Sequence, residues 1–350
     1  MLGGVRYFSK RMTQNTSDVI NAMRFPLIVL VLMVHSPGTF PSDTMEWSLE
    51  GWNIFHYLTE LISKHIGAIA TSCFFLFSGY LFFWKSNEEE FSLGWVLAKW
   101  KKRIKTLLIP YLIWNLLMVV AMSLMKDLTT GPIHWFVTGP VNFPLWFLRD
   151  LIIMSALAPL LYLICMKLRW ISLSALIIVY LSSLKTHIPS MNAIFFYGVG
   201  VWTATFKLDL SNFCRKAKTP AAIMAIILAV VSTALVGTPA HTAMLRLFIP
   251  FGIIAAWNIC EKAIGNQKTK KILSQLSPSV FFIYAVHEIY LLGWTKGLCL
   301  RIFGDSLTGT WIRYWIVPLA VLIICLCLYN LLKKTMPRAL TFACGGRTKE

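Results

Sequence analysis

The chain has 350 residues, of which 57% are hydrophobic and 14% are charged, and its mean hydropathy is +0.65. These values exclude an ordinary water-soluble globular protein and indicate an all-α, polytopic membrane protein. A net charge of +18 would suit a nucleic-acid-binding protein if the basic residues formed one soluble surface. They lie instead between apolar segments, so we expect membrane lipids and no nucleic acid as partners.

Apolar runs long enough to cross a bilayer recur along the chain, and we expect about ten transmembrane helices between residues 19 and 332. The expected spans are 19–37, 65–84, 106–125, 144–166, 170–184, 189–206, 220–237, 243–260, 273–295 and 314–332. With a cytoplasmic N-terminus, most of the 33 Lys and Arg residues fall in cytoplasmic segments. We therefore expect one membrane domain over residues 1–350, multi-pass in the inner (plasma) membrane, with short cytoplasmic termini.

The first span contains two ionisable residues, Arg24 and His35, which are eleven positions apart. On a helix this spacing corresponds to about 16 Å along the axis and to nearly the same face. Ionisable groups inside a membrane helix usually mark a functional site. The alternative is a snorkelling Arg and a buried, hydrogen-bonded His. Pro26 is expected at an early helical position.

An outer loop over residues 38–64 is expected before the second span, which ends with Ser78 and Gly79 in an aromatic run. Small residues at that point allow helices to approach closely. The loop that follows contains five basic residues between Lys99 and Lys105. Such residues orient a span or contact anionic lipids, but they could also bind the phosphates of a nucleotide-bearing cofactor.

The fourth span carries Arg149 and Asp150 near its outer end, and the ninth carries His287 and Glu288. Neighbouring residues on a helix point about 100° apart, so Arg149 and Asp150 are not expected to face one cavity together. We expect one to orient or neutralise the other through a neighbouring helix.

Two groups of candidate residues follow from these depths. An outer, catalytic group is expected to contain His35, Arg149, Asp150, His287 and Glu288. An inner, cofactor-binding group is expected to contain Arg24, Ser78, Gly79, Lys102, Arg103 and Lys105. This arrangement suits a donor that enters from the cytoplasm and an acceptor that enters from outside. No Cys or His spacing typical of a metal site is present, so no metal is expected.

These residues resemble the integral-membrane acyltransferase 3 family, which transfers acyl groups from acyl-CoA to hydroxyls of surface sugars. The resemblance extends over nearly the whole chain and rests on an ordered set of motifs: Arg24-x10-His35, Phe74-Phe75-Leu76-Phe77-Ser78-Gly79-Tyr80, the basic run into Ile109-Pro110-Tyr111, Leu145-Trp146-Phe147-Leu148 and Phe282-Ile283-Tyr284-Ala285-Val286-His287. The family's basic loop often contains Arg-x-x-Arg, whereas this chain has Lys102-Arg103-Ile104-Lys105, which leaves open which cation contacts the phosphates.

The resemblance implies a membrane O-acyltransferase that uses acetyl-CoA or succinyl-CoA as donor and a glycan or lipid-linked saccharide as acceptor. It implies acyl-CoA phosphates near Arg24 and Arg103, and His35 as general base on the acceptor hydroxyl. Arg149 would stabilise the oxyanion, and Asp150 or Glu288 would fix a histidine tautomer. Both direct transfer and an acyl-histidine intermediate are compatible with the sequence.

Two other function classes compete with this one. A proton-coupled transporter or flippase of a polar or lipid-linked sugar would also bury Arg, His, Asp and Glu in the membrane. The two halves of the chain show no internal repeat of the kind that many transporters carry. A structural membrane component would tolerate replacement of Arg24 and His35 with little loss beyond stability.

Overall fold

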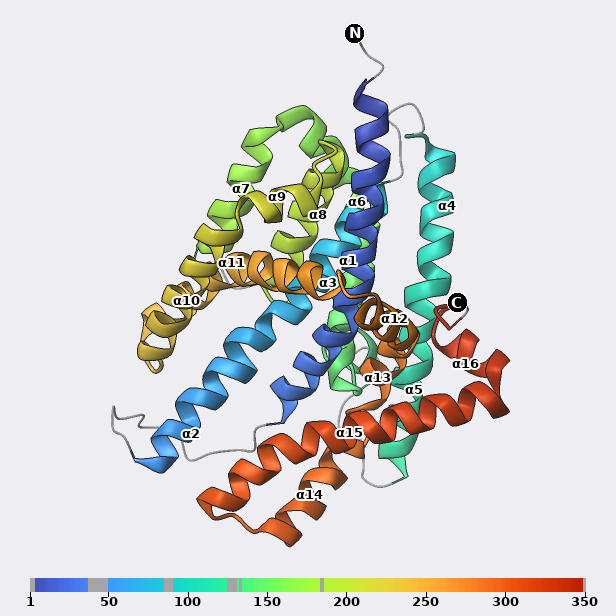
Figure 1. The fold of residues 1–350 in the computed structure, drawn as a ribbon. Helices are drawn as coiled ribbons and strands as arrows, with labels where there is room; N and C mark the ends of the chain where they lie inside the picture. The colour runs from blue at the N-terminus through green and yellow to red at the C-terminus, as the bar shows by residue number, and fades with distance from the viewer. Residues whose placement is uncertain are drawn as a thin grey trace. The chain divides into compact units, whose positions relative to one another are not determined.

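The computed structural model describes residues 4–36, 50–84, 91–124, 131, 134–182 and 186–348, with side chains from residue 15 onward. Almost all of these residues are helical and they contain no β-strand, so the predicted all-α fold is confirmed (Figure 1). The chain forms two compact units, each assembled from separate stretches of sequence.

The first unit contains residues 1–74, 206–277 and 303–318. Its elements are α1 (Gly4–His35), α2 (Gly51–Thr59), the π-helix η1 (Glu60–Ile66), the beginning of α3 (Gly67–Phe83), α9 (Leu210–Lys216), α10 (Lys218–Ala234), α11 (Pro239–Ala263), α12 (Gln267–Leu276) and the beginning of α15 (Leu307–Thr335). α10 and α11 pack against each other along their length, and α1 contacts α9, α11, α12 and η1. Asp209 and Asn266 begin α9 and α12 by accepting hydrogen bonds from free backbone N–H groups.

The second unit contains residues 75–205, 278–302 and 319–350. Its elements are the rest of α3, α4 (Leu93–Arg103), the π-helix η3 (Ile104–Leu108), α5 (Ile109–Ser123), the π-helix η4 (His134–Thr138), the 3₁₀ turn η5 (Phe143–Leu145), α6 (Trp146–Leu168), α7 (Trp170–Leu181), the π-helix η6 (Ala193–Tyr197), α8 (Gly198–Thr205), α13 (Val280–Val286), α14 (Leu291–Phe303), the rest of α15 and α16 (Pro337–Ala343). α6 contacts α4, α7 and α8 and is the central helix of this unit.

Six helical segments among the described residues are long and apolar enough to cross a membrane: Asn15–His35, Gly51–Phe83, Leu93–Ser123, Phe143–Leu168, Pro239–Ala263 and Leu307–Thr335. Two bent pairs, Leu210–Lys216 with Lys218–Ala234 and Gln267–Val286 with Leu291–Phe303, raise this number to eight. Trp170–Leu181 and Ala193–Thr205 are shorter apolar helices. These segments fall on the ten expected spans, and the protein is multi-pass, although ten as the number of spans and a cytoplasmic position of both termini stay predictions.

Two expected boundaries and one expected helix shape are wrong. α1 begins at Gly4, not near residue 19, so Pro26 lies in the helix interior. The helix of the second span begins at Gly51, inside the expected outer loop, because the amphipathic α2 precedes the apolar run. Residues 38–49 of that loop lie outside the described residues. The ninth span is not one straight helix but bends by 80° after Val286.

Candidate active site

Arg24 and His35 share α1, which confirms that they lie on one helix. Arg24 is partly buried, and its Nη1 donates a hydrogen bond to Oδ1 of Asn21 at 3.1 Å. The same oxygen accepts a hydrogen bond from the hydroxyl of Ser277 at 3.0 Å. Asn21 therefore orients the guanidinium and connects it to Ser277, near the beginning of the expected ninth span. Asn21 and Ser277 were not among the predicted site residues, although each is a polar side chain beside an apolar run.

His35 is the last residue of α1, and side chains from other helices hold the turn that carries it. The hydroxyl of Ser63 donates to the carbonyl of Met33 at 2.7 Å, and the hydroxyl of Ser36 donates to the carbonyl of Tyr314 at 2.8 Å. The hydroxyls of Ser63 and Tyr314 lie 2.9 Å apart. Fixed backbone of this kind suits a residue that must transfer a proton in one geometry.

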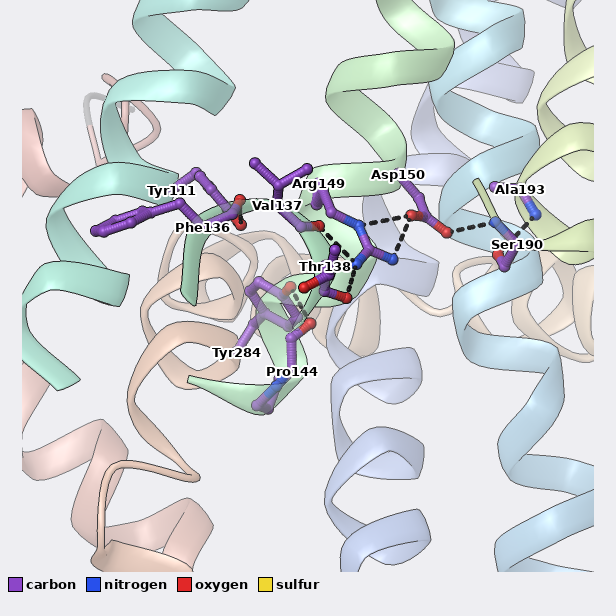
Figure 2. A network of polar contacts seen from close by, with 10 residues as sticks. All are labelled: Tyr111, Phe136, Val137, Thr138, Pro144, Arg149, Asp150, Ser190, Ala193 and Tyr284. Atoms are coloured by element: carbon purple, nitrogen blue, oxygen red, sulfur yellow. Dashed lines mark hydrogen bonds and ion pairs between the residues drawn. The ribbon is translucent and has the colours of Figure 1, made fainter. Parts of the chain in front are cut away.

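Arg149 and Asp150 form a direct ion pair in the first turns of α6 (Figure 2). Nε and Nη2 of Arg149 lie 3.1 and 2.9 Å from Oδ1 of Asp150. Oδ2 of Asp150 accepts the backbone N–H of Ser190 at 2.8 Å, and Nη1 of Arg149 donates to the carbonyls of Val137 and Thr138 at 3.1 and 2.8 Å. Asp150 is fully buried and Arg149 is 8% exposed, so each charge depends on the other.

The expectation that these two residues interact only through a neighbouring helix is wrong. The Arg149 side chain is long enough to turn toward the adjacent carboxylate, so the angle between the two Cβ directions does not keep them apart. The four contacts use all but one of the N–H groups that an arginine carries. The pair therefore clamps η4 and the turn before η6 onto α6.

The break after α13 lies at His287. Residues 287–290 form turns before α14, and Tyr290 has a φ of 56°, which residues other than glycine rarely adopt. His287 is fully buried, with Nδ1 2.8 Å from the carbonyl oxygen of Tyr284 and 3.1 Å from that of Ile283. Because a carbonyl only accepts hydrogen bonds, Nδ1 carries the proton and Nε2 carries the lone pair that a base requires. Two backbone carbonyls thus favour this tautomer.

Glu288 follows His287 in the break and is partly buried. It lies near enough to Lys296 on α14 for an electrostatic attraction between the carboxylate and the ammonium. Irregular backbone inside a membrane protein is tolerated where it is packed in protein or lines a water-filled space, and such breaks often mark binding sites.

Two buried amides support the break and were missed by the sequence analysis. Nδ2 of Asn142 donates to the carbonyl of Ala285 at 3.0 Å, next to the end of α13. The backbone N–H of Asn142 donates to Oδ1 of Asn115 at 3.1 Å, and Nδ2 of Asn115 donates to the carbonyl of Trp135 at 2.7 Å. Both side chains are fully buried. They connect α5, the η4 segment and the α13 terminus into one hydrogen-bonded unit.

The basic residues before the third span lie on a helix and not in the expected loop, because α4 continues directly into η3 and α5. Successive side chains therefore point in different directions. Lys102 and Lys105 are exposed, whereas Arg103 is partly buried, with its guanidinium carbon 5.3 Å from the centre of the Phe82 ring. Arg103 shares this position with Lys99, whose Nζ donates to the carbonyl of Phe82 at 3.0 Å and lies 4.8 Å from the centre of the Trp95 ring. These two residues are thus cations of the run that face protein.

Gly79 lies where α3 crosses α8. A Cβ on Gly79 would collide with the carbonyl oxygen of Tyr197, and a Cβ on Gly200 would collide with that of Leu76. The two backbones meet directly, which confirms the close helix approach predicted for this position. Ser78, one residue earlier, is partly buried. A cofactor-binding function of Ser78 and Gly79 stays a prediction.

Comparisons with known proteins identify the family. A family model described as an acyltransferase domain, of the acyltransferase 3 type, matches residues 18–330. The chain belongs to the acyltransferase 3 family. It is 27% identical over 366 residues to the succinoglycan biosynthesis protein ExoH of Rhizobium meliloti (strain 1021), covering 96% of this chain and 94% of that protein. No solved structure matches the acyltransferase. The protein is therefore a multi-pass membrane acyltransferase, and membership favours the enzyme over a transporter.

The predicted site residues of this acyltransferase are divided between its two units. Arg24 and His35 belong to the first, and all other predicted site residues belong to the second. Within the second unit, the structure brings Arg149 and Asp150 into direct contact. The gathering of the outer and inner groups across the units stays a prediction.

The acyltransferase also contains a buried ionisable cluster that the sequence analysis missed. His65 on η1 is fully buried, and its ring centre lies 5.5 Å from that of His241 on α11. Nε2 of His241 lies 3.5 Å from Oε1 of Glu60, and Nδ1 lies 2.9 Å from the carbonyl of Ser232. The signal in the sequence was a glutamate and a histidine five positions apart, placed in the expected outer loop and at the first residue of the second span.

Proposed function

We propose that this acyltransferase moves a short acyl group, acetyl or succinyl, from cytoplasmic acyl-CoA to a hydroxyl of an exported or cell-surface polysaccharide. The observation that carries the proposal is the end-to-end similarity to a protein named for succinoglycan biosynthesis, together with the family match over most of the chain. The acceptor would be the polysaccharide itself or a lipid-linked saccharide. The enzyme would lie in the plasma membrane with both termini in the cytoplasm.

The reaction requires a base for the acceptor hydroxyl, a group that stabilises the developing oxyanion, and residues that bind the acyl-CoA donor. In the proposed reaction His35 removes the proton from the acceptor hydroxyl, whose oxygen attacks the thioester carbonyl. The new C–O bond forms, the C–S bond breaks, and the departing CoA thiolate takes up a proton. His287 is a second candidate base, since its tautomer leaves the lone pair on Nε2.

The hydrogen bonds of Arg149 and Asp150 limit the functions that we propose for these two residues and for Glu288. Arg149 has one N–H beyond its four protein contacts for an oxyanion, so we propose that it acts first as a clamp. Both oxygens of Asp150 already accept hydrogen bonds, which leaves Glu288 as the carboxylate for fixing a histidine tautomer. Arg24 and Arg103 are the proposed phosphate contacts, with Ser78, Gly79, Lys102 and Lys105 around them.

The test is acyl-CoA turnover by the purified protein in proteoliposomes, read as free CoA from acetyl-CoA and succinyl-CoA with and without polysaccharide acceptor. Wild type, His35→Ala and Arg24→Ala are compared with His56→Ala and Arg215→Ala as matched controls outside the proposed site. Loss of a general base is expected to slow turnover by about 10²- to 10⁴-fold. We expect Arg24→Ala to raise KM for the donor. Turnover unchanged in both variants, or absent from the wild type with every donor and acceptor, would contradict the proposal.

A further inference from the structure

The chain after α16 forms a compact tail on the second unit. Gly345 and Gly346 adopt left-handed conformations, with φ of 63° and 81°, and reverse the direction of the chain. The carbonyl of Ala343 accepts a hydrogen bond from Nε1 of Trp114 on α5 at 2.9 Å, and Cys344 is fully buried. Figure 1 shows α16 beside α5, and the two helices are in contact. The tail, expected from the sequence only as a short terminus, is therefore part of the folded unit.

The reversed tail lies directly on the basic segment before the third span. A Cβ on Gly345 would lie 2.8 Å from both Cα and the carbonyl oxygen of Thr106, so only glycine fits there. Thr106 is on η3, immediately after Lys105 and three residues after Arg103. The tail thus adds its own residues to the neighbourhood of the predicted phosphate-binding cations.

Arg347 is a cation of the tail, and it lies two residues after Gly345, which contacts Thr106 of the basic segment. Its guanidinium carbon lies 4.3 Å from the centre of the Phe281 ring on α13, and its Nη1 donates to the carbonyl of Cys344 at 2.9 Å. These two contacts aim a partly exposed guanidinium at the beginning of α13.

Aromatic rings continue from Arg347 along one side of α13. The ring centres of Phe281 and Tyr284 lie 5.9 Å apart, and those of Tyr284 and His287 lie 6.5 Å apart. Each ring lies three residues after the one before it, so Phe281 and Tyr284 are neighbours on α13 and His287 follows at the end of that helix. Figure 2 shows the Tyr284 hydroxyl hydrogen-bonded to the carbonyl of Pro144, which fixes the middle ring of the row. A cation therefore lies at one end of an aromatic row and an imidazole at the other.

We propose that Arg347 binds a phosphate group of the acyl-CoA donor, with the pantetheine arm along Phe281 and Tyr284 and the thioester near His287. This inference rests on the proposed function. The order of side chains matches the order of groups in the donor, which has charged phosphates at one end and the reactive thioester at the other. A phospholipid headgroup offers the same phosphate chemistry, and the test separates the two sources.

The test compares Arg347→Gln with Arg338→Gln, a control that removes an exposed arginine from α16 of the same tail. A charge-assisted hydrogen bond to phosphate predicts that Arg347→Gln weakens binding of CoA and raises KM for acetyl-CoA by about ten- to a hundredfold, with kcat nearly unchanged. The kcat/KM for S-acetylpantetheine, which lacks the phosphates, is expected to stay the same. Arg347→Lys should retain part of the affinity, and melting temperatures establish that each variant is folded.

The outcomes separate this inference from the proposed function. If the wild type neither binds CoA nor turns over acyl-CoA, the proposed function itself fails. If the wild type is active and Arg347→Gln behaves like Arg338→Gln, the inference is overturned while the function stands. The same assays in nanodiscs of phosphatidylcholine alone and with phosphatidylglycerol identify the source of the phosphate. If Arg347→Gln raises KM for acetyl-CoA in both kinds of nanodisc, Arg347 contacts the donor phosphate. If it does so only in nanodiscs that contain phosphatidylglycerol, Arg347 binds lipid and the inference is overturned.

Discussion

The guanidinium of Arg149 and the carboxylate of Asp150 are buried together, and their hydrogen bonds extend to three separate backbone positions. A buried ion pair contributes little by comparison with apolar residues of the same volume, but removal of one partner leaves an uncompensated charge. The residue pair therefore matters most for holding η4 and the turn at Ser190 in place. Its effect on chemistry would be indirect, through the geometry of the neighbouring candidate site.

Replacing Arg149 by Gln is expected to destabilise the second unit by about 3–5 kcal/mol, because Asp150 keeps its charge without a cation. The double variant Arg149→Gln/Asp150→Asn should recover much of this loss. Thermal unfolding in detergent measures both effects. Arg215→Gln is the matched control, since that side chain is 57% exposed and its nearest carboxylate oxygen lies 3.8 Å away. An Arg149→Gln protein with wild-type stability and no turnover would contradict the clamp and support an oxyanion function.

At the scale of elements, the crossing of α3 and α8 depends on a glycine in each helix. Gly79 and Gly200 let the two backbones meet, and the carbonyls of Tyr197 and Leu76 occupy the space that Cβ atoms would need. Backbone cannot rotate away as a side chain can, so this crossing fixes the second half of α3. Phe82 on the same helix contacts Arg103 and Lys99 of the basic segment.

Gly79→Ala and Gly200→Ala are each expected to cost about 1–3 kcal/mol, since the added methyl group forces the helices apart. Gly198→Ala is the control on the same helix, because its Cβ would meet only the flexible end of the Leu176 side chain, at 3.0 Å. Midpoints of thermal unfolding in detergent test whether Gly79→Ala and Gly200→Ala destabilise the protein more than Gly198→Ala does. Equal midpoints for Gly79→Ala and Gly198→Ala would show that the crossing is looser than the backbone contacts indicate.

At the scale of the whole molecule, the orientation in the membrane that the basic residues predict can be tested at the tail. Arg338 is exposed, whereas Cys344 is buried and burial raises the pKa of its thiol to about 12. A thiol with a raised pKa is protonated at neutral pH and reacts slowly with alkylating reagents. In a background without the exposed Cys327, Arg338→Cys in intact cells should react with membrane-permeant maleimides only. Labelling by an impermeant maleimide would place the C-terminus outside, and rapid labelling of native Cys344 would contradict its burial.

Much of the fold could be predicted from hydrophobic patterns in the sequence. Apolar runs predicted the helical segments, and Arg24 and His35 could be placed on one helix because a single uninterrupted run contains both. The break at His287 could not be predicted, since no proline or glycine lies at residues 287–290 and the buried Asn142 that supports it is distant in sequence. The direct pairing of Arg149 with Asp150 was missed because helical geometry describes Cβ directions and not the reach of a long side chain.

The tail was missed for a related reason. Its position depends on two glycines in left-handed conformations and on a contact with Thr106, and neither leaves a periodic signal. Composition indicated only that the segment is basic.

The irregular backbone between α13 and α14 also bears on the side reaction of the acyl donor with water. Carbonyl and N–H groups freed by a helix break must be satisfied by protein or water, since hydrocarbon offers neither. Where water reaches His287, it can compete with the sugar hydroxyl as a nucleophile. In the proposed reaction, the thioester would then be hydrolysed, and CoA would be released without acylation of the acceptor. We therefore expect the ratio of acyl transfer to thioester hydrolysis to depend on how completely the bound acceptor fills the space at this break.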